Sequence, residues 1–236
     1  MTYPIAEMFY SIQGEGFWAG TPMYFIRLAG CTVGRYAAGY RAKQIFPISD
    51  ELKVLNKQHS ICTSATGSQF ICDTDYHSSQ RLTPEEIVAT LPEGCQRVCI
   101  SGGEPFMHDL KMLLERIADF GPSIHVETSG TIQPSDEVLA LIAHLCVSPK
   151  EGALPDMLAR ADEIKLLVGQ DTAIIELEDF LTDWASCDED CNHIYLQPIN
   201  AIYEVDQTMV QKCWSFLQLH PEWKLSAQLH KFVKMR

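Results

Sequence analysis

The chain has 236 residues, of which 46% are hydrophobic and 21% are charged. These values predict a single folded domain spanning residues 1–236, with a substantial core, and they exclude a mainly disordered or fibrous protein. The formal net charge of −13 argues against a nucleic-acid partner, because a polyanion is repelled by excess negative charge.

The sequence contains no apolar run long enough to span a membrane and no basic-then-apolar leader, so we expect a soluble, cytoplasmic protein without a membrane partner. Nine cysteines are present, and this odd number without a secretion signal favours metal ligation over a disulfide framework. Four of them lie among apolar residues and are predicted to be buried core side chains. They are Cys95, Cys99, Cys146 and Cys213.

The first predicted element is a buried strand at residues 21–30, TPMYFIRLAG, in which Arg27 is the one charged residue. A charge inside an apolar strand needs a partner. Residues 32–71 then lose regular periodicity. An irregular stretch of this length inside a compact domain predicts an insertion that is functional or carries small elements of its own.

From residue 81 onward, helices and strands are predicted to alternate. Thr83, Pro84 and Glu86 form a capping box with proline at the first helical position. Helices are predicted at 84–91, 110–117, 136–143, 155–161, 172–185 and 206–219. Strands are predicted at 97–101, 123–127, 144–148, 163–168, 193–197 and 224–230. This alternation predicts an α/β fold with right-handed crossovers and a mainly parallel sheet, either open or a partial barrel.

Polar or glycine-rich residues follow most of the predicted strands, at the C-terminal ends where α/β proteins place their functional groups. The segments are 101–104, 127–130, 148–150, 197–198 and 230–231. The segment SGGEP at 101–105 is by itself compatible with a tight turn between strand and helix. Neither a phosphate-binding P-loop nor a GxGxxG dinucleotide motif is present.

Five short motifs occur in a fixed order along the chain: QGEG (13–16), FIRLAGC (25–31), CDTD (72–75), SGGEP (101–105) and ETSG (127–130). Together they resemble the radical S-adenosylmethionine enzymes, and among these the 7-carboxy-7-deazaguanine synthase family of queuosine biosynthesis. The later pieces SPK, QP and LSAQLHK also follow in the expected order, so the resemblance covers most of the chain. It implies a partial (β/α) barrel of the radical S-adenosylmethionine type with an inserted cluster-binding loop.

In the family that this chain resembles, three cysteines bind a 4Fe-4S cluster and S-adenosylmethionine chelates the remaining iron. Cys31 and Cys72 occupy the first and last positions of the usual CxxxCxxC motif, but Gln69 stands where the middle cysteine is expected. Cys62 is the candidate by elimination, since no other cysteine lies between them. Two alternatives stay open: Cys62 is a surface thiol, or the cluster has been lost.

The resemblance also implies a reaction. One-electron reduction of the cluster cleaves S-adenosylmethionine to a 5′-deoxyadenosyl radical, which abstracts hydrogen from 6-carboxy-5,6,7,8-tetrahydropterin. Ring contraction with loss of ammonia then gives 7-carboxy-7-deazaguanine. Magnesium assists, with Thr74 as its protein ligand. A reducing partner such as flavodoxin or ferredoxin, and a homodimer, are implied as well.

Site residues are carried over from the same resemblance. Arg27 is expected to pair with the pterin carboxylate through its planar guanidinium, the alternative being a structural ion pair. The residues expected to contact the pterin are Ile12, Gln13, Gly14, Glu15, Arg27, Ser101 and His230. The residues expected to contact S-adenosylmethionine are Gly102, Gly103, Glu104, Thr128, Ser129, Ser148, Pro149, Lys150, Gln197, Pro198, Ile199 and Asn200. The role of Arg236 stays open.

Other interpretations remain at this point. His193 follows Cys187, Cys191 and three acidic residues, but half of a zinc site is missing, so a solvated acidic loop is predicted. The chain could instead be a radical S-adenosylmethionine enzyme with another substrate, such as an activating enzyme, although QGEG and Arg27 favour a small anionic substrate. It could also be a noncatalytic protein that kept the fold and lost the cluster.

Overall fold

A nine-stranded sheet forms the centre of the computed structural model, which describes residues 1–34, 60–72, 74, 79–182, 193–200 and 204–233. The strand order is β11-β10-β9-β8-β7-β6-β2-β1-β5. The strands are β1 (Tyr3–Ile12), β2 (Pro22–Leu28), β5 (Gln80–Leu82), β6 (Arg97–Gly102), β7 (Ser123–Thr128), β8 (His144–Val147), β9 (Glu163–Val168), β10 (Ile194–Pro198) and β11 (Lys224–Leu225).

The sheet is parallel from β2 to β11, whereas β1 runs antiparallel to both β2 and β5. The predicted α/β fold with a mainly parallel sheet is therefore confirmed. Among the described strands the sheet does not close into a barrel, since β5 and β11 lie at its two ends. β1 is absent from the predicted elements.

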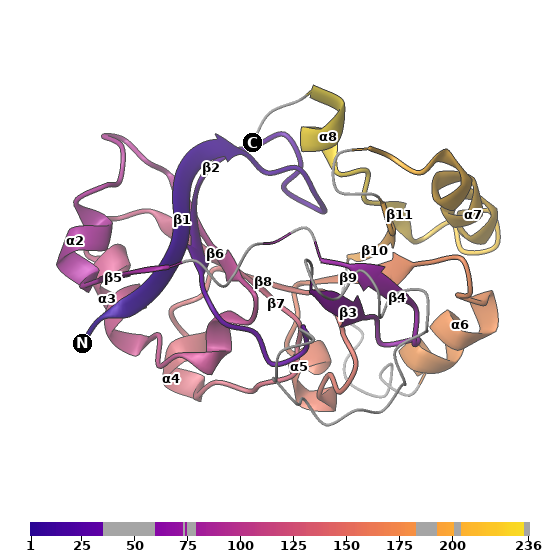
Figure 1. Cartoon of the computed structure of the whole chain (residues 1–236), viewed down its shortest axis with the longest axis horizontal. Coiled ribbons are helices and arrows are strands. Elements are labelled where there is room, and N and C mark those ends of the chain that lie inside the picture. The colour runs from indigo at the N-terminus through magenta and orange to yellow at the C-terminus, as the bar shows by residue number, and fades with distance from the viewer. Residues whose placement is uncertain (35–59, 73, 75–78, 183–192, 201–203, 234–236) are drawn as a thin grey trace.

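Most of the helices cover the outer side of the curved sheet, whereas α8 (Leu229–Val233) lies apart, beside the turn between β1 and β2 (Figure 1). The others are α2 (Pro84–Val88), α3 (Lys111–Ala118), α4 (Asp136–Leu139), α5 (Pro155–Ala159), α6 (Ile174–Thr182) and α7 (Gln207–Leu217), with a 3-10 turn η1 (Pro105–Met107). The predicted capping box is confirmed, because Thr83 Oγ1 accepts from the Glu86 N–H at 3.2 Å and Glu86 Oε2 accepts from the Thr83 N–H at 2.8 Å. None of the described helices is long and apolar enough to cross a membrane.

Several predicted elements are shorter in the structure. The helices expected at 84–91 and 136–143 end at Val88 and Leu139, and the last three residues of the helix expected at 172–185 lie outside the described part of the chain. The helix expected from residue 172 starts at Ile174, because the Thr172 hydroxyl instead accepts from the Gly169 N–H at 2.9 Å and bonds Ser68 at 2.8 Å. The strand expected at 224–230 is wrong beyond Leu225. Gln228 has a positive φ of 46°, which interrupts the extended chain before α8 begins.

The two faces of the parallel strands differ in chemistry. Side chains alternate along a strand, and one set packs with the helices in the main hydrophobic core, including Val98, Ile100 and Val126. Of the four predicted core cysteines, Cys213 is buried in this core and Cys95 is partly buried against it, whereas Cys99 is buried in a small second cluster and Cys146 is buried outside both clusters. The other set is largely polar. It includes Ser101, Glu127, His144, Glu163 and Lys165, which face the concave side of the sheet.

A separate two-stranded sheet lies within the predicted insertion. It consists of β3 (Ile61–Thr63) and β4 (Gln69–Ile71), which pair antiparallel, while residues 35–59 lie outside the described part of the chain. An antiparallel bridge joins Ser64 to Lys150, just beyond the C-terminal end of β8. The insertion therefore carries small elements, and this bridge attaches them to the strand ends.

Candidate active site

A cavity of about 1040 Å³ lies at the C-terminal ends of the parallel strands. Every predicted site residue except Glu104 and Pro149 lines it. The three predicted cluster cysteines and the predicted pterin residues thus share one cavity, although together they range from Ile12 to His230 in the sequence. This placement agrees with the expectation that function resides at the strand ends.

A row of alternating charges crosses the sheet along one wall of the cavity. Glu7 on β1 lies opposite Arg27 on β2, and Glu7 Oε1 accepts from Arg27 Nε at 2.8 Å. Arg27 is in turn the neighbour of Ser101 on β6, whose hydroxyl donates to Glu127 Oε2 on β7 at 3.3 Å. Lys165 on β9 continues the row, 3.4 Å from Glu127 Oε1. The row brings two cations and two carboxylates to a partly enclosed surface.

Lys165 also holds the QGEG turn in place. Its ammonium group, with 4% of the side chain exposed, donates to Glu15 Oε2 at 2.6 Å. Burial raises the pKa of Glu15, but the charge and hydrogen bond of Lys165 outweigh that effect and bring the pKa to about 2. Burial lowers the pKa of Lys165, yet the surrounding acidic groups raise it well above its usual value. Both groups are therefore charged at neutral pH.

Gln13 and Gly14 complete this end of the cavity. The Gln13 amide donates to Glu127 Oε1 at 2.9 Å, and its carbonyl accepts from the Glu15 N–H at 3.1 Å. Gly14 has no room for a side chain, since a Cβ there would overlap the His230 ring. The Gly14 carbonyl accepts from the Leu229 N–H at 2.6 Å. The start of α8 is consequently packed against the turn (Figure 1).

Arg27 has the partners that its position in an apolar strand requires. Besides the Glu7 ion pair, its Nη1 donates to the Thr74 hydroxyl at 3.1 Å. The structural ion pair considered from the sequence is therefore present. The guanidinium also lines the cavity, with 22% of the side chain exposed, so pairing with a pterin carboxylate stays a prediction.

The β3–β4 hairpin explains how Cys62 and Cys72 can act together. Cys62 lies opposite Phe70, and the Cys72 N–H bonds the Ser60 carbonyl at 2.9 Å, which extends the same ladder by one residue. Alternation then places Cys62 and Cys72 on one face of the hairpin as diagonal neighbours. Gln69 precedes Phe70 by one residue, so its side chain lies on the opposite face of the hairpin. Although nine residues separate Cys62 from Cys72, both thiols therefore lie on the same face of the β3–β4 hairpin.

Cys31 approaches the same cavity from the end of β2. Its sulfur accepts from the N–H groups of Val33 at 3.4 Å and Gly34 at 3.3 Å, and such hydrogen bonds tune an iron–sulfur centre. Gly103 at the end of β6 packs directly on this segment, because a Cβ there would lie 2.6 Å from the Cys31 Cβ. Gly103 is therefore required for close packing against the cysteine loop, and Gly102 for close packing against the Leu28 backbone at the end of β2.

The thiols lie near charges of both signs, because beyond the effect of burial the Glu104 carboxylate raises the pKa of Cys31 whereas the Lys150 ammonium lowers it. Cys62 is buried, with 6% exposure, so it is not the surface thiol considered from the sequence. Burial raises the pKa values of Cys31 and Cys62, and the ammonium group of Lys150 opposes this effect in both. No three His, Cys, Asp or Glu side chains of the described residues share a single-ion site. Cys31, Cys62 and Cys72 are free thiols that line the same cavity, and a 4Fe-4S cluster with three cysteine ligands needs thiolates that reach one common site.

Glu104 lies behind the cavity wall and is completely buried. Its carboxylate accepts from the Thr128 hydroxyl at 2.8 and 2.9 Å, from the Ser129 N–H at 2.9 Å and from the Ser129 hydroxyl. It also accepts from the Phe106 N–H at 3.0 Å. Glu104 therefore fixes the position of Thr128 and Ser129, which do line the cavity, while its own contact with S-adenosylmethionine stays a prediction.

Several residues of the site are absent from the predicted set. They are Glu7, Glu127, Lys165, Ser226 and Gln228. Lys165 had a recognisable signal, because it is a lone cation inside the apolar strand EIKLLV, as Arg27 is in its own strand. The Ser226 hydroxyl donates to Gln197 Oε1 at 2.8 Å and accepts from the Gly16 N–H at 3.2 Å, and no pattern in the sequence indicates these contacts.

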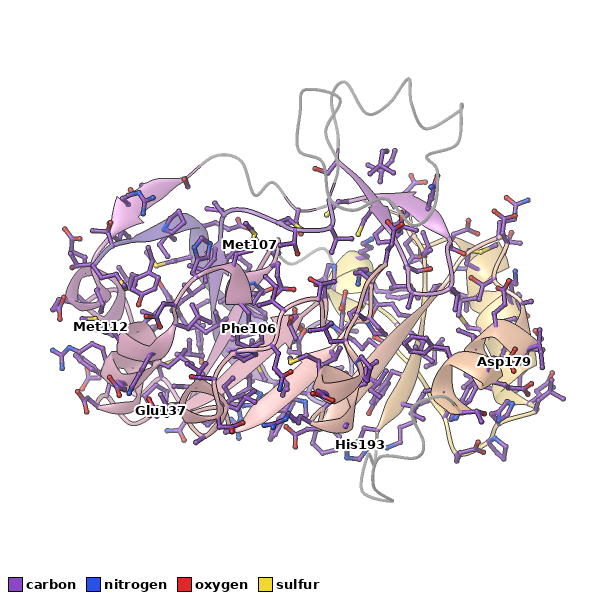
Figure 2. All side chains as sticks on the ribbon, turned by 90° about the horizontal axis from the view of Figure 1, so that it is seen from below. Phe106, Met107, Met112, Glu137, Asp179 and His193 are labelled. Atoms are coloured by element: carbon purple, nitrogen blue, oxygen red, sulfur yellow. The ribbon has the colours of Figure 1, made fainter. Side chains whose placement is uncertain are left out.

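His193 lies at the edge of the molecule opposite the β3–β4 hairpin (Figure 2). Its ring stacks on Phe17 with 4.4 Å between the ring centroids, and its Nδ1 lies 3.3 Å from the Lys224 ammonium. The acidic residues and cysteines that precede it, 187–191, fall outside the described residues. His193 is thus remote from the predicted cluster.

Comparison with known proteins identifies relatives along the full length of the chain. No protein-family model matches it. A 7-carboxy-7-deazaguanine synthase of Synechocystis sp. is 32% identical, covering all of this chain and 95% of the relative. Enzymes of the same name from Escherichia coli K12 and Bacteroides thetaiotaomicron are 31% and 30% identical over the whole of both chains.

A solved structure shares the fold. The crystal structure of QueE from Escherichia coli superposes with a TM-score of 0.65 at 28% sequence identity. The match covers 96% of this chain and 93% of the other. The chain therefore belongs to the 7-carboxy-7-deazaguanine synthase family, whose members are radical S-adenosylmethionine lyases of queuosine biosynthesis.

Proposed function

We propose that this cavity converts 6-carboxy-5,6,7,8-tetrahydropterin to 7-carboxy-7-deazaguanine with loss of ammonia. The family uses a 4Fe-4S cluster, S-adenosylmethionine and Mg²⁺. The observation that carries the proposal is that three cysteine thiols and the charged residues Glu15, Arg27 and Lys165 line one cavity. An activating enzyme would need room for a partner backbone, whereas these charges suit a small anionic ring system.

The pterin is proposed to bind at the QGEG end of the cavity. Glu15 and Glu127 are carboxylates that accept hydrogen bonds, which matches the N–H donors on a 2-amino-4-oxo-pyrimidine ring. Arg27 offers a planar cation for the substrate carboxylate. The proposed contact residues are those predicted from the sequence: Ile12, Gln13, Gly14, Glu15, Arg27, Ser101 and His230.

Magnesium is proposed to bind the Thr74 hydroxyl. Mg²⁺ prefers oxygen ligands and keeps several waters, so one hydroxyl together with substrate oxygens suffices. The Thr74 oxygen accepts from Arg27 Nη1 at 3.1 Å, which holds the hydroxyl beside the group proposed to bind the substrate carboxylate. One residue pair would thus position both the carboxylate and the metal.

Cys31, Cys62 and Cys72 are proposed to ligate the cluster, and S-adenosylmethionine to lie along the strand ends. When bound, the cluster and S-adenosylmethionine supply one-electron, hydrogen-abstracting chemistry, and the protein binds and orients. The backbone at Gly103 packs against the Cys31 segment and that at Gly102 packs against Leu28, and the Lys150 ammonium adds positive charge near the thiols. Thr128, Ser129, Ser148 and the 197–200 segment complete the proposed wall.

The wider assignments follow from the same family. We propose that residues 1–236 act as one domain, that the protein is cytoplasmic, and that it forms a homodimer. A small reducing protein such as flavodoxin or ferredoxin would supply the electron. The formal net charge of −13 supports the expectation that nucleic acid is not a partner.

Anaerobic reconstitution with iron and sulfide tests the proposal, followed by incubation with reductant, S-adenosylmethionine, Mg²⁺ and the carboxypterin. We expect the broad visible absorption of a 4Fe-4S cluster and formation of 7-carboxy-7-deazaguanine. Cys62→Ala should lose the visible absorption, whereas Cys213→Ala, a buried thiol packed in the hydrophobic core, should keep it. Cleavage of S-adenosylmethionine without the deazaguanine product would point to another substrate, and an unchanged cluster in Cys62→Ala would exclude that ligand.

A further inference from the structure

Gln228 connects the two sides of the cavity that are assigned to different ligands. Its side-chain amide donates from Nε2 to Glu15 Oε1 at 2.7 Å, and its Oε1 accepts from Asn200 Nδ2 at 2.7 Å. Glu15 belongs to the proposed pterin end and Asn200 to the proposed S-adenosylmethionine wall. Gln228 is buried, with 6% exposure, and it lines the cavity.

The direction of these hydrogen bonds is fixed by chemistry. An ionised carboxylate can only accept, so Gln228 must present its NH₂ group to Glu15 and its oxygen to Asn200. Asn200 must then donate from its own NH₂ group, which leaves its Oδ1 to accept from the Asp206 N–H at 2.9 Å. Asp206 is the N-cap of α7. A single polarised chain therefore runs from this cap through Asn200 and Gln228 to Glu15.

The backbone at Gln228 indicates that this orientation is enforced. Its φ of 46° is the one positive value among the non-glycine residues that the structure describes. Such a conformation costs free energy and persists where the surroundings determine it, which is common at functional sites. Here the flanking residues are anchored, since the Leu229 N–H donates to Gly14 and the Ser226 hydroxyl bonds Gln197.

We propose that Gln228 is a positioning residue that couples pterin binding to S-adenosylmethionine binding. A pterin that fixes the Glu15 carboxylate also fixes the Gln228 amide, which orients Asn200 toward the other ligand. The effect must be reciprocal, because the factor by which one ligand tightens the other is the same in both directions. This inference rests on the proposed function, since it assigns the two ligands to Glu15 and Asn200.

Binding measurements on the reconstituted protein test the coupling. Calorimetry gives the Kd of S-adenosylmethionine with and without saturating carboxypterin and Mg²⁺, and the Kd of the pterin with and without S-adenosylmethionine. We expect each ligand to tighten the other by the same factor, about fivefold or more. In Gln228→Gly, which accepts the positive φ but lacks the amide, that factor should fall to near one, and more S-adenosylmethionine should be cleaved per product formed.

Two further variants separate positioning from a general structural effect. Gln228→Asn keeps an amide and tolerates positive φ, but it is one methylene too short to span both partners, so it should also lose coupling. Gln218→Gly, at the exposed C-cap of α7, makes the same chemical change away from the cavity and should behave as wild type. If Gln228→Gly does not fold, Gln228→Asn carries the comparison.

The outcomes distinguish this inference from the proposed function. Absence of coupling in the wild type, or wild-type coupling in the folded Gln228 variants, would overturn the inference while leaving product formation intact. An equal loss of affinity for both ligands with an unchanged coupling factor would also overturn it. A wild-type protein that binds S-adenosylmethionine but makes no deazaguanine would instead remove the proposed function.

Discussion

Replacement of Lys165 by methionine tests the buried charge network most directly. Lys165→Met keeps the length of the side chain but removes its charge. The Lys165 ammonium lies 2.6 Å from Glu15 and 3.4 Å from Glu127, and only 4% of its side chain is exposed. Removal of the cation leaves Glu15 and Glu127 with neutral hydrogen-bond donors but without the ammonium group between them. Breaking a buried ion pair in this way costs about 3–5 kcal/mol.

The lowered pKa of Glu15 gives a second estimate of the stability that Lys165 contributes. Its pKa falls from 4.5 to about 2 in the folded protein, and at 1.36 kcal/mol per pH unit this difference corresponds to about 3 kcal/mol of stability at neutral pH. The two estimates agree. At roughly 2–4 °C per kcal/mol for a chain of this size, the melting temperature should fall by roughly 6–20 °C.

The effect of pH on the stability contributed by Glu15 should have opposite signs in the wild type and in Lys165→Met. In the wild type the pKa of Glu15 is lowered, so its contribution is fully present above pH 4.5 and is lost as the pH falls toward 2. In Lys165→Met, burial is opposed only by Gln228 and His230, and we expect the pKa of Glu15 to rise above 4.5. The variant should then lose stability as the pH rises from 4.5 through this raised pKa. Its loss of stability relative to the wild type should therefore be larger at pH 8 than at pH 5.

Thermal unfolding followed by circular dichroism at pH 5, 6.5 and 8 measures this deficit. Lys111→Met is the matched control, because Lys111 forms an exposed ion pair with Glu137 and its loss should leave the melting temperature nearly unchanged. A Lys165→Met variant as stable as the control, or one whose deficit shrinks toward pH 8, would refute the argument that Glu15 is a buried anion held by Lys165.

Three further changes follow from the geometry. Gly103→Ala should lower the iron content after reconstitution, because its Cβ would lie 2.6 Å from that of Cys31. Gly94→Ala is strained by a φ of 74° but has open space around its Cβ, so it should keep full iron content even if it is less stable. Glu7→Gln should raise the KM for the pterin about tenfold by loosening Arg27, a change of about 1.4 kcal/mol, and an equal rise in the KM for S-adenosylmethionine would contradict this. Gln228→Ala should be less stable than Gln228→Gly by about 1 kcal/mol in urea unfolding, because φ is 46°, and equal stabilities would show that this backbone carries no strain.

The alternating part of the fold could be predicted because its local signals are strong. The Thr83–Glu86 capping box and the apolar stripe of Leu110, Leu113, Leu114 and Ile117 each mark a helix, and all four stripe residues are buried. β1 gave no comparable signal, since a register shift between Ile5 and Glu7 interrupts its two-residue period. The strands of the β3–β4 hairpin have three residues each, too few to establish a period.

The candidate site could be predicted only in part, for a related reason. The motif residues lie in short segments that are recognisable one at a time, such as QGEG and SGGEP. The contacts that hold them depend on the topology, because Lys165 and Gln228 reach Glu15 across 150 and 213 residues of sequence. Nothing local to Gln228 indicates such a contact. Only the crossover order of the strands and the return of α8 over the β1–β2 turn bring it there.

The cost of the buried charges bears on whether this chain has kept a catalytic role. Replacing a buried ion pair by apolar residues of similar size is often neutral or stabilising, so stability alone gives little reason to retain Glu15 and Lys165 inside the sheet. The chain retains both, together with Arg27 and its ion pair to Glu7, along the wall of a cavity that also contains three free thiols. A noncatalytic protein that kept only the fold would need neither the charges nor the thiols. Their joint presence favours an enzyme that binds a charged substrate beside a cluster, and the hairpin places Cys62, the proposed middle ligand, on the same face as Cys72.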